Sequence, residues 1–438
     1  MPEPVVAGVD IGSGAARAVA ITRTGAVAAF ASATYHEAAA PPGQADPAGW
    51  FEAALTALAG LGAEPTAVAF GGQAPTTVAA SGERAFTLRH PAGAGTDSAG
   101  QHAAQAAWLR ERFGRGTRPR QLWDWVAARL GARPGEQSVW PGSAPLPGFG
   151  DPVAAGSSLG ETDGAGGLAS GIVLGAGAND AFLAAWASGM DRPGKVFDPG
   201  GSTGGLGVVV RAAEHAEAAA FGMAAAVPGL AIVGGPAAAL GGSLSWWSRI
   251  TGQPIEALLG HAAVVPAGAF GVMVLPFFEC ERAPRWDPAL RAEIVGLRLE
   301  HGAGVVARAL LEAGAYGLAH IARTLAAQGI GLDRLVCSGS PSRSPLWNAM
   351  KAAVLEVPVD VPSFPDMSAY GAALAAGAAL GWWPRPGEGG AGDWPLPEMA
   401  TVTPEPLAAY REGLERFIAL GDEAAARPRL RSDGKGED

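Results

Sequence analysis

Two stretches of the chain share one pattern: an apolar strand, a Gly/hydroxyl turn and a second apolar strand. The first spans residues 5–21 and turns at 12–14, and the second spans 196–210 and turns at 200–204. In each stretch an acid, Asp10 or Asp198, precedes the turn, although Asp is a poor strand former. The shared order predicts an internal duplication in which each copy opens one half of the chain, with chance similarity in a Gly-rich sequence as the alternative.

The remaining pattern alternates between apolar segments with strand character and segments with helical spacing. We expect residues 131–168, rich in Gly, Pro and Ser, to form a surface excursion. A helix over 181–189 follows Asn179-Asp180, where either side chain would lie near the helix N-terminus. The alternation of strands and helices predicts an α/β fold. The other expected helices are 50–61, 101–113, 120–130, 303–328, 344–355 and 368–380, and the other strands are 66–72, 170–175, 271–275, 333–338 and 357–361.

Composition narrows the class of protein. A length of 438 residues with 48% apolar residues allows a large core and two or three domains. The formal net charge of −10 argues against a nucleic-acid binder. Two cysteines and scattered histidines argue against a disulfide framework and a His/Cys zinc site. The N-terminus lacks the pattern of a signal peptide, and the apolar run 368–383 is short for a membrane span, so we expect a cytoplasmic protein.

Three glycine turns that carry hydroxyls are candidate phosphate sites. At such turns backbone N–H groups converge and no Cβ blocks the approach of a phosphate, although a plain tight hairpin is the alternative for each turn alone. The chain has no G-x-x-x-x-G-K-[ST] motif and only three lysines, so N–H groups, hydroxyls, Arg and Mg²⁺ would have to balance the phosphate charge. The turns are Gly12-Ser13-Gly14, Gly201-Ser202-Thr203 and Ser338-Gly339-Ser340.

In order and spacing, four segments of the chain resemble the FGGY family of carbohydrate kinases, in the actin-like ATPase superfamily. Residues 10–17 resemble its first phosphate motif, and residues 177–205 resemble its central acid, helix and second phosphate motif. Residues 275–288 are similar to its GERxPxWDP segment. Residues 338–347 and 368–373 resemble its adenosine region and closing helix. The xylulokinase branch is the nearest in these motifs.

The resemblance implies an α/β fold with two actin-like (ribonuclease H-like) domains and a ligand cleft between them. Residues 1–194 would form the N-terminal domain, which binds sugar and carries the catalytic acid. Residues 195–425 would form the C-terminal, nucleotide-binding domain, and 426–438 a flexible tail. The implied activity is ATP- and Mg²⁺-dependent transfer of the γ-phosphate to a hydroxyl of a ketopentose or a related sugar or polyol.

The resemblance also implies roles for individual residues. Asp180 would be the general base, because transfer to a hydroxyl needs an acceptor for the departing proton; a helix cap only is the alternative. Asp10 and Asp180 would face Mg²⁺. For Glu281 and Arg282, a buried ion pair that braces the Pro-rich turn is the alternative to a substrate contact. The implied nucleotide contacts are Gly12, Ser13, Gly14, Arg17, Gly201, Ser202, Thr203, Gly339 and Ser340, and the implied substrate contacts are Gln73, Asp97, Asn179, Asp180, Glu281 and Arg282.

Several positions depart from the family pattern. The first half is shortened between about residues 80 and 170, the family's Trp-x-Asp-x-Arg segment keeps only Asp97, and its SGQMHG-like motif keeps Gln73 without Met-His. In the adenosine region the glycine run is reduced to Gly339. These losses keep open a catalytically degenerate sugar- or nucleotide-binding regulator on the same fold, and another enzyme of the superfamily. The expected partner is a small-molecule sugar, without nucleic acid or membrane, and a homodimer stays open.

Overall fold

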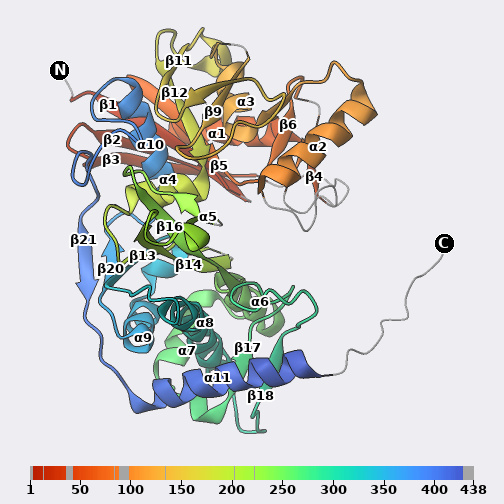
Figure 1. Cartoon of the computed structure of the whole chain (residues 1–438), viewed down its shortest axis with the longest axis vertical. Coiled ribbons are helices and arrows are strands. Elements are labelled where there is room, and N and C mark those ends of the chain that lie inside the picture. Colours follow the sequence, from red (N-terminus) through yellow and green to blue (C-terminus); the bar gives the residue numbers. More distant parts are fainter. Residues whose placement is uncertain are drawn as a thin grey trace. The chain divides into compact units, whose positions relative to one another are not determined.

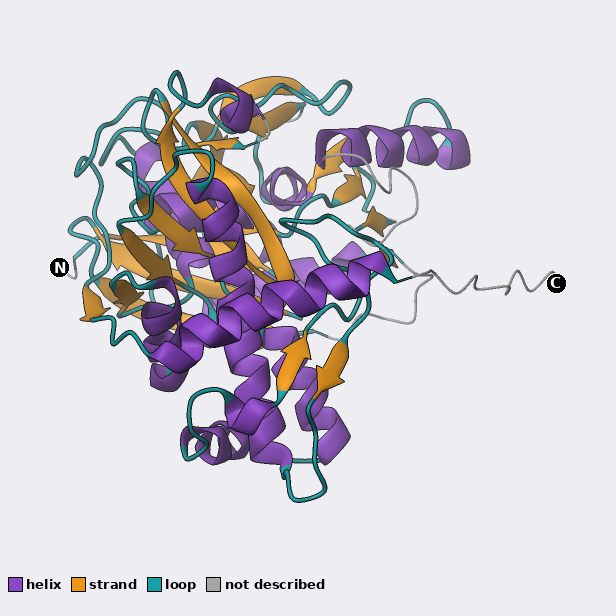
Figure 2. Ribbon diagram, turned by 60° about the horizontal axis from the view of Figure 1, so that its bottom comes forward, coloured by secondary structure: helices purple, strands orange, loops and turns teal. Residues whose placement is uncertain are grey.

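The computed structural model describes residues 3–12, 14–35, 43–82, 84–87, 98–133, 135–201, 203–220 and 222–427, in a mixture of helices and strands (Figure 2). Contacts divide the chain into two compact units. The first unit is Met1–Pro193, Val209–Val233 and Pro362–Glu398, and the second is Gly194–Val208, Gly234–Val361 and Met399–Asp438. Along the chain the first unit gives way to the second between Pro193 and Gly194, one residue from the predicted boundary at 194/195. Segments 209–233 and 362–398, however, group with the first unit, so the division is more interleaved than the sequence predicted.

A six-stranded sheet forms the centre of the first unit, in the order β11-β12-β5-β1-β2-β3. Strands β1, β2 and β3 are antiparallel neighbours, whereas β1, β5 and β12 run parallel. The strands are β1 (Val5–Ile11), β2 (Ala15–Thr22), β3 (Val27–Thr34), β5 (Ala67–Gly72), β11 (Ser158–Glu161) and β12 (Val173–Asn179).

Helices cover both faces of this sheet. Successive residues of a strand point to opposite faces, so the neighbours of two adjacent glycines show which helix lies on each face. A Cβ on Gly72 would meet Leu122 of α3 (Leu122–Arg129), whereas a Cβ on the preceding Gly71 would meet Leu183 of α4 (Asp180–Ala187). Helix α1 (Pro47–Gly60) packs on β1, β2 and β3.

Helix α10 (Met367–Ala379) contacts β1, β5 and β12 and also packs against α4 (Figure 1). A Cβ on Gly8 of β1 would lie 2.0 Å from the backbone nitrogen of Ala373, so strand and helix touch backbone to backbone. This contact explains why residues 362–398 belong to the first unit.

The main sheet of the second unit has the order β15-β16-β14-β13-β19-β20-β21, with β15 and parts of β14 and β16 grouped in the first unit. Strand β13 is antiparallel to β14 and parallel to β19, which is parallel to β20. The strands are β13 (Lys195–Asp198), β14 (Thr203–Arg211), β15 (Met223–Ala224), β16 (Leu230–Ala239), β19 (Arg334–Cys337), β20 (Val359–Pro362) and β21 (Met399–Val402).

The two sheets share one topology. Counted along the chain, β3-β2-β1-β5-β12 and β16-β14-β13-β19-β20 both follow the order third, second, first, fourth, fifth. Each begins with one of the hairpins that the sequence singled out, β1–β2 and β13–β14. The predicted internal duplication is therefore present in the strand order, and the α/β fold class is confirmed.

Helix α8 forms the buried centre of the second unit's helical layer. Among the described helices it is long and apolar enough to cross a membrane, but 89% of its apolar window is buried, as in the core helix of a folded unit. It packs against α6, α7, α9 and α11. The helices are α6 (Gly241–Thr251), α7 (Ile255–Ala263), α8 (Ala303–Ala326), α9 (Pro345–Leu355) and α11 (Ala408–Ala426), and β17 (Met273–Leu275) pairs with β18 (Glu293–Val295).

The expected surface excursion over 131–168 was wrong in part. It contains β9 (Glu136–Val139) and β10 (Asp151–Ala154), which pair with each other, and the edge strand β11. Strands of four residues are too short to show an alternating pattern, so the Gly- and Pro-rich composition concealed them. Helix α2 (Ser98–Phe113) and a small sheet of β4 (Gln44–Ala45), β7 (Ala85–Phe86), β6 (Thr77–Ala79) and β8 (Pro119–Gln121) complete this part of the first unit.

Candidate active site

Three predicted residues meet at the carboxyl ends of the parallel strands in the first unit. Asp10 of β1 is paired in register with Gly71 of β5, which is paired with Ala178 near the end of β12. Asn179 ends β12, and Asp180 begins α4. Parallel strands bring their carboxyl ends to one edge, where α/β proteins usually bind ligands. The register thus unites Asp10 and Asp180, which are far apart in the sequence.

Arg17 connects Asp10 to a third acid. It lies opposite Asp10 in the β1–β2 register, with its Nη1 3.8 Å from Asp10 Oδ2. Its Nε lies 3.3 Å from Oδ1 of Asp366, the residue before α10. Arg17, predicted to neutralise phosphate charge, therefore also neutralises carboxylates. Asp366 was missed because its only signal in the sequence is a place before a helix.

The surroundings of Asp10 and Asp180 hold the pKa of both carboxyls above the usual range. Burial is the main cause at each. At Asp10 the charge of Asp180 raises the pKa further, Arg17 opposes the rise, and Asp366 adds a smaller increase. At Asp180 a hydrogen bond from the Ala181 N–H opposes the rise. A carboxylate whose pKa is raised toward neutrality is a better proton acceptor.

The first turn of α4 tests whether Asp180 is needed as a helix cap. Asn179 is the N-cap residue, and its Oδ1 accepts the Ala181 N–H at 2.7 Å. Asp180 Oδ1 accepts the same N–H at 2.7 Å. Because Asn179 already satisfies this donor, capping does not require Asp180. The role of Asn179 in the structure is the cap, and its predicted substrate contact stays a prediction.

Two buried polar atoms without a hydrogen-bond partner among the described residues lie at this edge of the sheet, Asp10 Oδ1 and Gln73 Nε2. A third such atom, Thr76 Oγ1, follows three residues after Gln73 in the chain. Gln73 directly follows β5, and its N–H donates to the Ile11 carbonyl at 3.2 Å. Buried polar groups are nearly always paired, so this cluster indicates a site for a polar ligand. Asp10 and Gln73 were predicted from the sequence as site residues, whereas Thr76 was not.

The first glycine turn is held by an aromatic residue that the sequence did not reveal. The Tyr35 hydroxyl donates to the Gly12 carbonyl, and the Tyr35 N–H donates to the Gly14 carbonyl at 3.3 Å. A Cβ on Gly14 would have nothing within 4 Å, so that side of the turn is open. Ser13 lies outside the described residues.

The second and third glycine turns, which were predicted separately, form one structure in the second unit. Gly200 has a φ of 60°, and a Cβ there would lie 1.9 Å from the Ser338 carbonyl oxygen. The Ser338 hydroxyl donates to the Pro199 carbonyl at 2.9 Å. Gly339 has a φ of 70°, and its Cβ would lie 2.9 Å from the same Pro199 oxygen. The two turns therefore pack backbone against backbone, which only glycine permits.

The edge of this double turn carries the other predicted nucleotide contacts. Gly201 accepts a hydrogen bond at 3.1 Å from the Gly241 N–H at the start of α6. Thr203 begins β14, and Ser340 is exposed at the start of a short turn over 340–343. Ser202, like Asp97 of the substrate set, lies outside the described residues.

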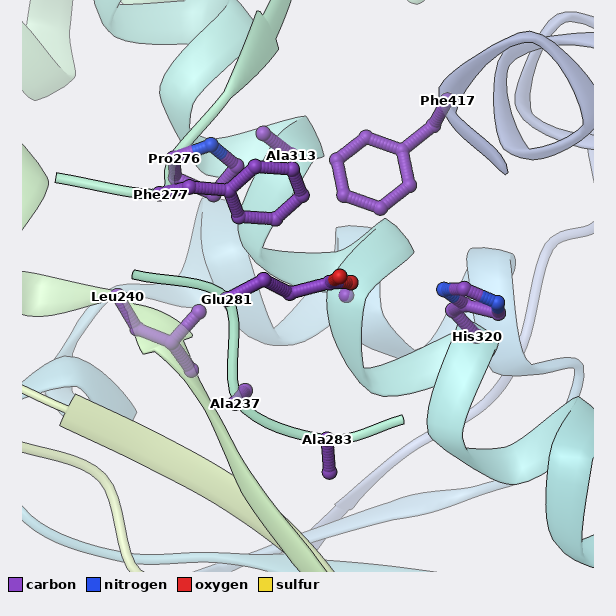
Figure 3. A pocket seen from close by; sticks show the side chains of 10 residues that line it. Ala237, Leu240, Pro276, Phe277, Glu281, Ala283, Ala313, His320 and Phe417 are labelled. Atoms are coloured by element: carbon purple, nitrogen blue, oxygen red, sulfur yellow. The ribbon is translucent and has the colours of Figure 1, made fainter. Parts of the chain in front are cut away.

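Glu281 forms an ion pair, as in one of the two interpretations that the sequence left open. Its buried carboxylate points into a small cavity of the second unit that is also lined by His320 (Figure 3). Its Oε1 lies 2.6 Å from Nη1 of Arg285, which also contacts Asp422 of α11 at 2.8 Å. The structure thus favours the alternative interpretation, a buried ion pair that braces the Pro-rich turn, with Arg285 in place of Arg282.

The carboxylate oxygens of Asp10 and Asp180 are ligands of the kind that a magnesium ion binds. In the described ranges no group of three or more His, Cys, Asp or Glu side chains is suited to hold a metal. Asp10 and Asp180 offer two carboxylates, one with an unpaired buried oxygen. Mg²⁺ is often bound by one or two carboxylates together with substrate phosphates and water.

The C-terminal part of the chain matches a known protein family. Residues 226–380 match the model of the C-terminal domain of the FGGY family of carbohydrate kinases. A glycerol kinase from Gloeobacter violaceus is 40% identical over 134 residues, which cover 30% of this chain and 26% of that protein. The chain thus matches about a quarter of the length of this curated relative.

Solved structures extend the likeness in fold to nearly the whole chain. A xyloylose kinase from Brucella ovis has a TM-score of 0.78 and 22% identity, covering 96% of this chain and 99% of that one. A xylulose kinase from Rhodospirillum rubrum has a TM-score of 0.74 and 26% identity, with the same coverage. The fold of this chain is that of FGGY kinases.

Proposed function

Starting from the FGGY carbohydrate-kinase C-terminal domain in residues 226–380, we propose that the protein is an ATP-dependent sugar kinase. The observation that carries the proposal is the meeting of Asp10 and Asp180 at one sheet edge, each with a pKa raised by burial. Neighbouring Gln73 and Thr76 supply unpaired polar atoms for a hydroxylated ligand. We further propose a cytoplasmic protein that acts on small molecules.

In the proposed reaction, Asp180 accepts the proton of the substrate hydroxyl as its oxygen attacks the γ-phosphate of ATP. Its side chain is free for this task because Asn179 caps α4. Arg17 holds Asp10 and Asp366 and limits the repulsion among the acids. Asp10 and Asp180 would hold Mg²⁺, which supplies charge neutralisation for the phosphates when bound.

The glycine turns are proposed to contact the phosphates. The turn at Gly12 and Gly14 would contribute backbone N–H groups and the Ser13 hydroxyl. The double turn of Gly200, Gly201 and Gly339 would contribute backbone N–H groups. At Gly14, where an added Cβ would have nothing within 4 Å, a phosphate can approach the backbone closely.

As substrate we propose a ketopentose of the xylulose type. The support is the likeness in fold to xylulose kinases over nearly the whole chain. Glycerol is the second candidate, since the 40% identical relative is a glycerol kinase. Ala74 and Pro75 stand after Gln73 where the family motif has Met-His, so this segment offers no His side chain that would favour one substrate over the other.

A panel assay tests the function. ADP release from ATP–Mg²⁺ is measured against pentuloses, hexuloses, pentitols and glycerol, with Asp180→Asn as the control for background hydrolysis. We expect turnover with one class of acceptor that depends on Asp180. Binding of nucleotide or sugar by calorimetry, without turnover of any acceptor, would favour the degenerate regulator.

A further inference from the structure

A fully buried ion pair lies beneath the second glycine turn. Asp198 ends β13 and Lys351 lies within α9; both side chains have 0% exposure, and Lys351 Nζ lies 2.5 Å from Asp198 Oδ2. Such a pair is expensive to desolvate, and an apolar pair of similar volume is often as stable. The position of this pair therefore calls for a role beyond stability.

The second oxygen of Asp198 holds the turn itself. Asp198 Oδ1 accepts the N–H of Gly200 at 3.1 Å and the N–H of Gly205 at 3.4 Å. These residues flank the turn on either side, so one carboxylate oxygen sets the conformation of the segment between them. The Asp198 carbonyl accepts the Ser338 N–H at 3.0 Å, which joins the same residue to the third turn.

Lys351 is the buried counter-ion of this carboxylate. Besides Asp198, its ammonium faces the Cys337 Sγ at 3.6 Å and the ring of Trp347 at 4.9 Å. Neither of these neighbours supplies a negative charge, so among the contacts described Asp198 is the counter-ion of Lys351. A charged carboxylate accepts N–H bonds roughly twice as strongly as a neutral acceptor. The lysine thus acts on the turn through Asp198.

We propose that Asp198 and Lys351 are positioning residues that fix the glycine turn between Gly200 and Gly205, so that its remaining backbone N–H groups can bind the phosphates of the nucleotide. The inference rests on the proposed function, because it assigns the turn to ATP. Both oxygens of Asp198 are engaged within the protein. Its role is therefore to order the turn rather than to touch the ligand.

Nucleotide binding to the full chain tests this role. Calorimetry with ATP–Mg²⁺, and competition with AMP, are compared for the wild type, Lys351→Met and the control Arg308→Met. Arg308 forms another buried ion pair of the second unit, with Nε 2.7 Å from Oε1 of Glu312. We expect Lys351→Met to weaken ATP binding at least tenfold and AMP binding less than threefold. Arg308→Met should leave both affinities within threefold of the wild type.

A charge-neutral double variant covers the case in which Lys351→Met does not fold. Asp198→Asn with Lys351→Met leaves no unpaired buried charge, so the protein should fold. Its ATP affinity should still be at least fivefold below that of the wild type.

Three results would overturn the inference while leaving the kinase proposal intact: wild-type ATP affinity in either Lys351 variant, equal losses for ATP and AMP, or equal losses in Lys351→Met and Arg308→Met. A wild-type protein that binds no nucleotide would refute the proposed function, and this inference with it.

Discussion

Replacing Asp180 by Asn separates the two interpretations of this residue. If Asp180 were only a helix cap, the variant would change the stability little, because Asn caps a helix about as well as Asp. The structure predicts a gain in stability instead. The Ala181 N–H keeps its partner in Asn179, while the loss of a buried carboxylate removes the repulsion with Asp10.

The expected gain in stability follows from the raised pKa of Asp180. In the folded chain the carboxyl holds its proton to a higher pH than in the unfolded chain, so ionisation destabilises the fold as the pH rises. Asp180→Asn removes this destabilisation but must still desolvate an amide, so its free energy of unfolding at pH 8 should exceed that of the wild type by about 1–2 kcal/mol. This difference should shrink toward zero at pH 4, where the wild-type carboxyl is protonated. For a unit of this size the gain corresponds to a rise in Tm of roughly 2–8 °C.

The same variant should lose activity, since general-base help is worth about 10²- to 10⁴-fold in kcat. Calorimetric Tm at pH 8 and pH 4 is measured together with kcat on the substrate found in the panel. Asn179→Ala serves as the matched control: it leaves Asp180 ionisable and still bonded to the Ala181 N–H, so it should bring no gain in Tm at pH 8. Retained kcat in Asp180→Asn, or a lower Tm at pH 8, would refute the reasoning.

Three further predictions concern other parts of the structure. Gly200→Ala should lower the free energy of unfolding, measured by urea denaturation, by at least about 3 kcal/mol, because the new Cβ meets the Ser338 oxygen. Gly252→Ala, at a similar φ but with nothing within 4 Å of the Cβ, should lower it by about 1 kcal/mol, and equal losses would contradict the close packing at Gly200. Arg285→Met should lower the free energy of unfolding by about 3–5 kcal/mol, because it leaves Glu281 buried and unpaired. Arg298→Met, which removes an exposed pair with Glu300, should lower it by less than about 1 kcal/mol. Similar urea midpoints for the two variants would show that Glu281 does not need Arg285. Burial lowers the pKa of His102 to about 4, so on acidification the unfolded chain takes up this proton before the folded chain does. The free energy of unfolding should therefore fall by up to about 3 kcal/mol as the pH drops from 6.5 to 4. His102→Gln, which can still bond to Thr77, should reduce this fall, and an unchanged pH profile in the variant would assign the fall to other groups.

The local pattern of the sequence determined most of the secondary structure. The β1–β2 and β13–β14 hairpins, α8, α9 and α10 were expected near their observed positions, because apolar periodicity and glycine turns are local properties. The pattern also marked Asp10, because an acid inside an apolar strand opposes the strand's own preference.

The long-range pairings were decided by the tertiary structure alone. The parallel register of β1, β5 and β12 unites Asp10 and Asp180, and α10 brings Asp366 to Arg17. The partner of Glu281 and the link from Lys351 to Asp198 likewise depend on how helices pack on strands. The physical reason is that an ion pair or an orphan polar atom is defined by what surrounds it after burial. In the sequence, Lys351 is one more charge on a helix, whereas in the folded chain it has only Asp198 to neutralise it among the contacts described.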